Sequence, residues 1–410
     1  MKRLLPAHPG FRLLFLSSLA TLFGDGLFIL SSILIVKKIS NNVTALSWMF
    51  ILTMVPSIVL APFAGAVIDR LEKRTLALAS LVARAALIAT TAGLLLTDHA
   101  SLVFVYAAII LNDTFYYFLS PTTDSITREL LGEDEYVRGE SFMQGAWQVG
   151  LMFSSLAAGA LMTYLGTAQT MLCAAVAYAL AALILWRLRL SSRPQAREPV
   201  AAAEAGWLRD IQQGWRYVQG RGPLFYASLA ASLSLPLMQA LNILIAPFNE
   251  DLLHGTPMTL GFIDAAVSTG GILSAMICVG LAQRRQLGGV TMIALALLAG
   301  SLVLFVSSRS VPLAIVTYTA VGTFAGMFKV LSKSIVYRHV EAAFVGRAMT
   351  TISMASLIIS IGVSLLVGFV GERSLSGAYF LLAGFLFVPA GLIALAQRKV
   401  AATADASGVV

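Results

Sequence analysis

The chain has 410 residues, of which 58% are hydrophobic and only 12% charged, and its mean hydropathy is +0.84. Soluble domains carry about 25% charged residues, and one of this size could not bury so much apolar surface in a single core. The net charge of +8 does not indicate a nucleic-acid partner, because the basic residues lie at the ends of apolar segments rather than in one module. We therefore expect a membrane protein surrounded by lipid.

A helix needs about 20 mostly apolar residues to cross the hydrocarbon core of a bilayer. The first candidate is not a signal peptide, because it is too long, contains Asp25 and lacks a cleavage site. The sequence predicts an all-α membrane protein with twelve such helices, at residues 12–36, 45–67, 75–97, 101–121, 141–163, 168–188, 224–248, 258–282, 288–307, 311–331, 345–370 and 375–397.

The distribution of Lys and Arg predicts the orientation. If the N-terminus is cytoplasmic, the opposite side holds only four of the 28 basic residues, namely Lys37, Lys38, Arg309 and Arg373. Because cytoplasmic loops carry the excess of basic residues, we expect both termini in the cytoplasm of a bacterium whose inner membrane holds the chain.

One long connection divides the helices six and six. We expect an N-terminal bundle at 1–188, a cytoplasmic linker at 189–222 and a C-terminal bundle at 223–410. In the linker, Trp207, Ile211, Trp215 and Val218 share one face of a predicted helix. This helix either lies on the cytoplasmic leaflet or is a connector docked on the protein.

A short basic turn follows the second helix. It reads Gly65-Ala-Val-Ile-Asp69-Arg70-Leu-Glu-Lys73-Arg74, and Arg284 and Arg285 follow the eighth helix at the corresponding place. With twelve helices in two halves, the chain resembles the major facilitator superfamily, whose loop pattern here departs only at Glu72, where a glycine is usual. The resemblance implies two pseudo-symmetric bundles and transport by alternating access.

Looser patterns resemble the branch that includes the enterobactin exporter and the macrolide-efflux proteins. They are Leu22-Phe-Gly-Asp25-Gly26, the prolines Pro56 and Pro62, and Phe118-Leu-Ser-Pro121. This resemblance implies proton-coupled export of an amphipathic drug-like or macrolide-like compound, or of a siderophore. We also expect the protein to be a monomer. A lipid or lysophospholipid flippase, an importer on the same fold and a membrane sensor stay open.

Ionisable groups within membrane helices are costly and indicate function. Asp25, flanked by two glycines, is the first candidate for proton coupling, and the alternative is a structural aspartate near the outer gate. Arg84 and Asp113 lie at matching depths on consecutive helices, so we expect an ion pair between them, either structural or a switch.

Three further ionisable residues are expected near helix ends. Asp264 is expected at the outer end of its helix or at a gate. Lys329 and Lys333 are expected to close the tenth helix, with their ammonium groups reaching the cytoplasmic interface.

Polar and aromatic residues within the helices are candidates for substrate contacts or, alternatively, for interhelical hydrogen bonds. They are Asn112, Tyr116, Gln144, Gln148, Gln239 and Asn242.

The superfamily resemblance assigns the loop a gating role. The expected gating residues are Gly65, Asp69, Arg70, Lys73, Arg74 and Asp124, and the alternative is a loop whose charges only set topology. No phosphate-binding loop, metal motif or catalytic motif is present in the sequence. We therefore expect no cofactor, no metal and no enzymatic activity.

Overall fold

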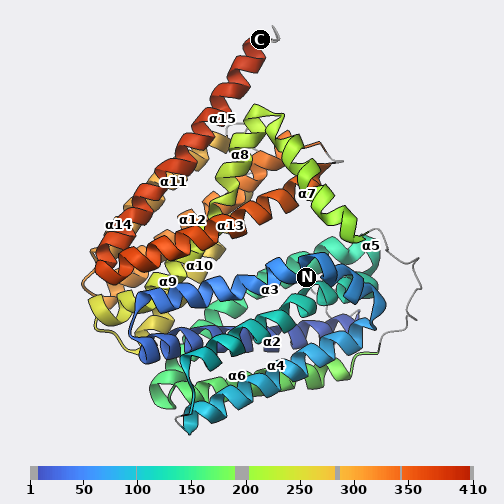
Figure 1. The fold of residues 1–410 in the computed structure, drawn as a ribbon, viewed down its shortest axis with the longest axis vertical. Coiled ribbons are helices and arrows are strands. Elements are labelled where there is room, and N and C mark those ends of the chain that lie inside the picture. The colour runs from blue at the N-terminus through green and yellow to red at the C-terminus, as the bar shows by residue number, and fades with distance from the viewer. Residues whose placement is uncertain (1–7, 98, 190–202, 282–286, 342–343, 407–410) are drawn as a thin grey trace. The chain divides into compact units, whose positions relative to one another are not determined.

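The computed structural model describes residues 8–97, 99–189, 203–281, 287–341 and 344–406, without the side chains of 61–70, 132–134, 137–138, 141, 203–210 and 401–406. The regular structure of these ranges is helical (Figure 1). The helices are α2 (Pro9–Ser40), α3 (Val43–Arg70), α4 (Lys73–Leu96), α5 (Leu102–Tyr164), α6 (Thr167–Trp186), α7 (Ala203–Gln219), α8 (Gly222–Ser232), α9 (Ser234–Pro247), η1 (Phe248–Leu252), α10 (Pro257–Leu281), α11 (Leu287–Val306), α12 (Val311–His339), α13 (Val345–Arg373), α14 (Leu375–Phe385) and α15 (Phe387–Ala406).

Twelve stretches of the described chain are long and apolar enough to span a membrane, which confirms the predicted number and the all-α class. The fourth and the tenth continue furthest beyond their predicted ends. The fourth runs over Leu102–Leu131 and the tenth over Val311–His339. The predicted ends lay close to polar residues, between Ser120 and Thr122 in the fourth helix and shortly after Lys329 in the tenth, but a helix satisfies its own backbone hydrogen bonds and can continue through such residues.

The fourth and fifth spans both lie within α5, which has 63 residues and contains Pro121. The backbone bends between the two spans. A Cβ on Gly139 would lie only 3.6 Å from Cγ of Leu131, whereas a straight helix would separate these positions by about 12 Å.

The chain forms two compact units. Unit 1 comprises Met1–Asn41, Leu52–Glu204 and Thr256–Ala265, and unit 2 comprises Asn42–Ile51, Ala205–Gly255 and Ala266–Val410. Helices α3 and α10 are therefore each divided between the units. The expected assignment of 1–188 and 223–410 to two six-helix domains stays a prediction.

Unit 1 is built around four helices. In it α2 packs against α5 and α6, and α4 packs against the same two helices. An apolar cluster that includes Leu81, Leu119 and Ala181 lies between them. This packing brings the polar residues of α2, α4, α5 and α6 together.

Helix α7 is docked on unit 2 along its C-terminal half. Val218 is only 2% exposed and belongs to an apolar cluster of this unit. The ring of Tyr217 stacks on Phe344 with centroids 4.2 Å apart, and Trp215 meets Phe225 edge to face. These contacts show that residues 211–219 pack on unit 2, and the expectation that the linker helix lies on the cytoplasmic leaflet stays a prediction.

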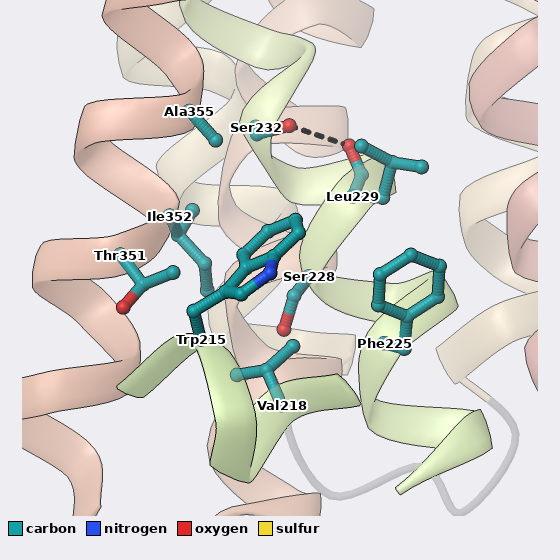
Figure 2. A pocket seen from close by; sticks show the side chains of 9 residues that line it. All are labelled: Trp215, Val218, Phe225, Ser228, Leu229, Ser232, Thr351, Ile352 and Ala355. Atoms are coloured by element: carbon teal, nitrogen blue, oxygen red, sulfur yellow. Dashed lines mark hydrogen bonds between the residues drawn. The ribbon is translucent and has the colours of Figure 1, made fainter. Parts of the chain in front are cut away.

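A small pocket lies under the docked helix (Figure 2). It has a volume of about 20 Å³ and lies between α7, α8 and α13. Drug-sized ligands need about 300–1,000 Å³, so this pocket is not a cargo site. Its lining residues are Trp215, Val218, Phe225, Ser228, Leu229, Ser232, Thr351, Ile352 and Ala355.

The docked end of α7 contributes to stability. We expect Val218→Ala to lower the free energy of unfolding by about 1–3 kcal/mol, because it leaves a cavity in a closely packed cluster. Thermal unfolding of the purified protein measures this. Exposed Gln219→Ala on the same helix is the control, and equal stability of the two variants would contradict the docking.

Candidate functional site

A buried arginine lies at the centre of unit 1. Arg84 is in the middle of α4, and its side chain is only 1% exposed. Burying a charge is unfavourable unless it is paired and hydrogen-bonded. The residues around Arg84 therefore define the candidate site.

Three neighbouring helices each supply a partner. Nη2 of Arg84 donates to Oδ1 of Asp25 on α2 and to the hydroxyl of Tyr178 on α6, the latter at 2.9 Å. Nε of Arg84 donates to Oδ1 of Asn112 on α5 at 3.0 Å. The Tyr178 hydroxyl in turn donates to Oδ1 of Asp25 at 2.8 Å. Charge-assisted bonds of this kind are stronger than neutral ones, so the network holds the carboxylate and the guanidinium in a defined geometry.

Two aromatic rings complete the site. The guanidinium carbon of Arg84 lies 4.2 Å from the ring centroid of Tyr178 and 5.5 Å from that of Tyr116, within reach of cation–π attraction. Tyr178 is fully buried, whereas Tyr116 is 39% exposed and the Asp25 side chain 13% exposed. The site is therefore accessible at Asp25 and Tyr116 and closed at Arg84.

Glycines let α2 approach closely enough to place Asp25. A Cβ on Gly24 would lie 2.9 Å from the Tyr178 ring, and one on Gly26 would collide with Ser154. Real Cβ atoms almost never come so close. The two glycines that flank Asp25 thus permit the contact between α2 and its neighbours that forms the site.

The sequence analysis predicted an ion pair for Arg84 but named the wrong partner, Asp113. The carboxylate hydrogen-bonded to Arg84 is Asp25, and Asp113 acts on the arginine only through its charge. Adjacent residues point about 100° apart around a helix. Because Asn112 faces Arg84, Asp113 faces elsewhere, which a comparison of depths could not show.

One donor of the arginine is left over. Nη1 of Arg84 is buried and has no hydrogen-bond partner among the atoms that the structure describes. Unmet buried donors are rare and call for an explanation. Arg84 therefore retains hydrogen-bonding capacity beyond its three described partners.

The other predicted substrate contacts are dispersed. Asn112 is buried and accepts a hydrogen bond from Arg84, so in this structure it helps to hold the arginine side chain. Gln144 is exposed and donates to Glu140 at 3.1 Å, and Gln148 is half-buried on the same helix. Gln239 and Asn242 are half-buried on α9 of unit 2. Contact of these residues with a substrate stays a prediction.

The predicted gating loop is only partly described. Gly65, Asp69 and Arg70 lie in the part of α3 for which only the backbone is described. Lys73 forms an ion pair with Glu129 at 3.3 Å, and Nη2 of Arg74 donates to the carbonyl of Trp186 at 2.5 Å.

Asp124, the sixth gating candidate, is exposed and interacts through charge with Arg128 and Glu140. Its expected interaction with the loop, and the gating role itself, stay predictions.

Comparison with known proteins identifies the family. The sequence model of the Major Facilitator Superfamily matches residues 14–364. The chain belongs to this superfamily. It is therefore a multi-pass membrane transporter and not an enzyme. No curated protein sequence matches the chain.

Solved structures of other superfamily transporters share its fold. The nucleoside transporter NupG matches with a TM-score of 0.74 at 14% identity, over 94% of this chain and 98% of that one. A bacterial homologue of the lysosomal transporter Spinster matches with a TM-score of 0.73 at 13% identity, over 95% and 96%. A bacterial homologue of the iron transporter ferroportin matches with a TM-score of 0.72 at 15% identity, over 95% and 99%. Identities this low show the fold alone.

The sequence analysis of this superfamily member did not identify two hydrogen-bonding residues, Tyr178 and Ser155. Tyr178 is central to the site, and its signal was the presence of one tyrosine in the mostly apolar segment 167–186. Ser155 on α5 donates to Asp264 on α10 within unit 1 at 2.5 Å. This bond explains how Asp264 is tolerated in a membrane helix, and its expected gating role stays a prediction.

Proposed function

We propose that the protein exports amphipathic small molecules by alternating access, in exchange for protons, with Asp25 as the coupling carboxylate. The observation that carries the proposal is the Arg84–Asp25 pair, in which a fully buried arginine holds a partly exposed carboxylate. Asp25 can meet water while its partner cannot, so proton transfer at Asp25 changes the balance of charge in a buried network.

Charge balance supports a role for a single proton. When ionised, Asp25, Asp113 and Arg84 carry a net charge of −1, and these groups interact electrostatically. Net charge within a membrane helix is costly. Uptake of one proton by either carboxylate brings the net charge of these three residues to zero, and release of that proton restores the net charge of −1. The unpaired Nη1 of Arg84 supplies a donor for the alternative pairing with Asp113.

The cargo and its direction rest on the resemblance to exporters. Drug-like or macrolide-like compounds and siderophores fit the branch that the motifs around Asp25 and Pro121 resemble. The names of the matched solved structures do not narrow this choice, since they include nucleoside, peptide and iron transporters. Among the described residues there is no group of three or more His, Cys, Asp or Glu that could hold a metal ion.

We further propose that the protein is a monomer in the bacterial inner membrane, with both termini in the cytoplasm.

Transport by the purified protein in proteoliposomes tests the function. A pH gradient is imposed, and uptake of labelled lipophilic cations, macrolides and catecholate siderophores is compared with that of protein-free liposomes. Accumulation of one class that a protonophore abolishes supports the proposal. Uptake that does not depend on the pH gradient, or no uptake of any compound class by a folded protein, contradicts the proposal.

A further inference from the structure

Helix α12 of unit 2 carries two lysines well before its C-terminal end. The helix has 29 residues and ends at His339, so Lys329 lies about 15 Å before that end. The sequence predicted an end at residue 331, two residues after Lys329. Instead about two further turns follow, so Lys329 and Lys333 lie on one continuous helix that fixes their spacing.

The two lysines continue a stripe of α12 that packs on α10. A Cβ on Gly322 would lie 2.8 Å from Cα of Val267, and one on Gly326 would lie 2.8 Å from Cβ of Ser274. Positions three and four apart share a helix face, so Lys329 and Lys333 follow Gly322 and Gly326 on that stripe.

The lysine end of the stripe is accessible. Lys329 is exposed and Lys333 half-buried, whereas Leu331, two residues from each lysine and therefore on the opposite side of the helix, is buried. Because charge facing lipid is costly, we take the lysine side of α12 to meet water.

Neither lysine side chain has an acidic partner among the residues that the structure describes. The next acid along the chain, Glu341, pairs with Arg221. Lys329 and Lys333 repel each other electrostatically. An anion placed between them would relieve this repulsion.

We propose that Lys329 and Lys333 form a binding site for the anionic group, a carboxylate or a phosphate, of an amphipathic small molecule. Tyr337, one turn beyond Lys333, is exposed and offers an aromatic surface for an apolar body. The inference rests on the proposed function only in taking the bound molecule to be cargo. It assigns that cargo a negative charge, which favours organic anions over lipophilic cations.

Binding to the full-length protein in nanodiscs tests the site without any gradient. The probes are naphthalene-1-acetate, its neutral amide and 1-naphthyl phosphate, titrated by calorimetry with empty nanodiscs as the blank. We expect an anion to bind about tenfold more tightly than the amide, as for a charge-assisted contact. The tighter of the two anions identifies carboxylate or phosphate.

Matched variants separate the site from general effects. Lys329→Gln and Lys333→Gln should each remove most of the preference for the anion while leaving amide binding unchanged, and Lys329→Arg should retain it. Lys38→Gln, at an exposed position of α2, is the control. Equal affinities of the wild type for charged and neutral probes, no binding of either anion, or an unchanged preference in both Gln variants would overturn the inference. Failure of proton coupling would leave these titrations unaffected.

Discussion

Asp25→Asn is expected to reduce uphill, pH-driven transport to the level of protein-free liposomes. The amide keeps the size of the side chain and an oxygen that can accept from Arg84 and Tyr178, but it cannot take up and release a proton. Exchange of labelled for unlabelled cargo without a gradient should persist, because it needs alternating access but no net proton movement. Both activities are measured in the same proteoliposomes.

The control is Asp251→Asn, at an exposed aspartate of unit 2, which should transport like the wild type. Uphill transport preserved in Asp25→Asn would remove this residue from the coupling mechanism. Loss of exchange together with uphill transport would indicate that Asp25 is structural.

Arg84→Gln is expected to destabilise the protein by about 3–5 kcal/mol, the usual effect of removing one member of a buried ion pair. It leaves the Asp25 carboxylate without its cationic partner and removes the donor to Asn112. The double variant Arg84→Gln/Asp25→Asn should be more stable than the sum of the two single effects predicts, because it removes both charges. Thermal unfolding of the purified variants measures all three.

The size of this coupling decides whether the pair acts as a unit. Additive effects in the double variant would contradict a direct interaction between Arg84 and Asp25. A stable Arg84→Gln protein would show that the arginine is not needed to hold the four helices together.

The membrane fold was predictable because it depends on composition and on segment length. Runs of about 20 apolar residues located the twelve spans, and the motif from Gly65 to Arg74 indicated the superfamily. Helix ends were less predictable. The predicted tenth helix ended at residue 331, whereas α12 continues to His339, since polar residues do not stop a helix whose backbone is satisfied.

The site was only partly predictable for a different reason. The cost of burying charge singled out Asp25 and Arg84 as special residues. Their pairing depends on how α2 and α4 are rotated about their axes, and depth along a helix does not report rotation. Tyr178 was missed because a single tyrosine in an apolar helix is usually packing, and only its position beside Asp25 and Arg84 reveals its role.

The most direct test of the central claim is proton movement driven by the cargo itself. A pH-sensitive dye is trapped inside proteoliposomes, no pH gradient is imposed, and a cargo that the transport screen has identified is added outside. The proposal predicts that protons leave the lumen as cargo enters, and that Asp25→Asn abolishes this signal. Cargo entry without any change in luminal pH, or with protons moving in the same direction as the cargo, would contradict it.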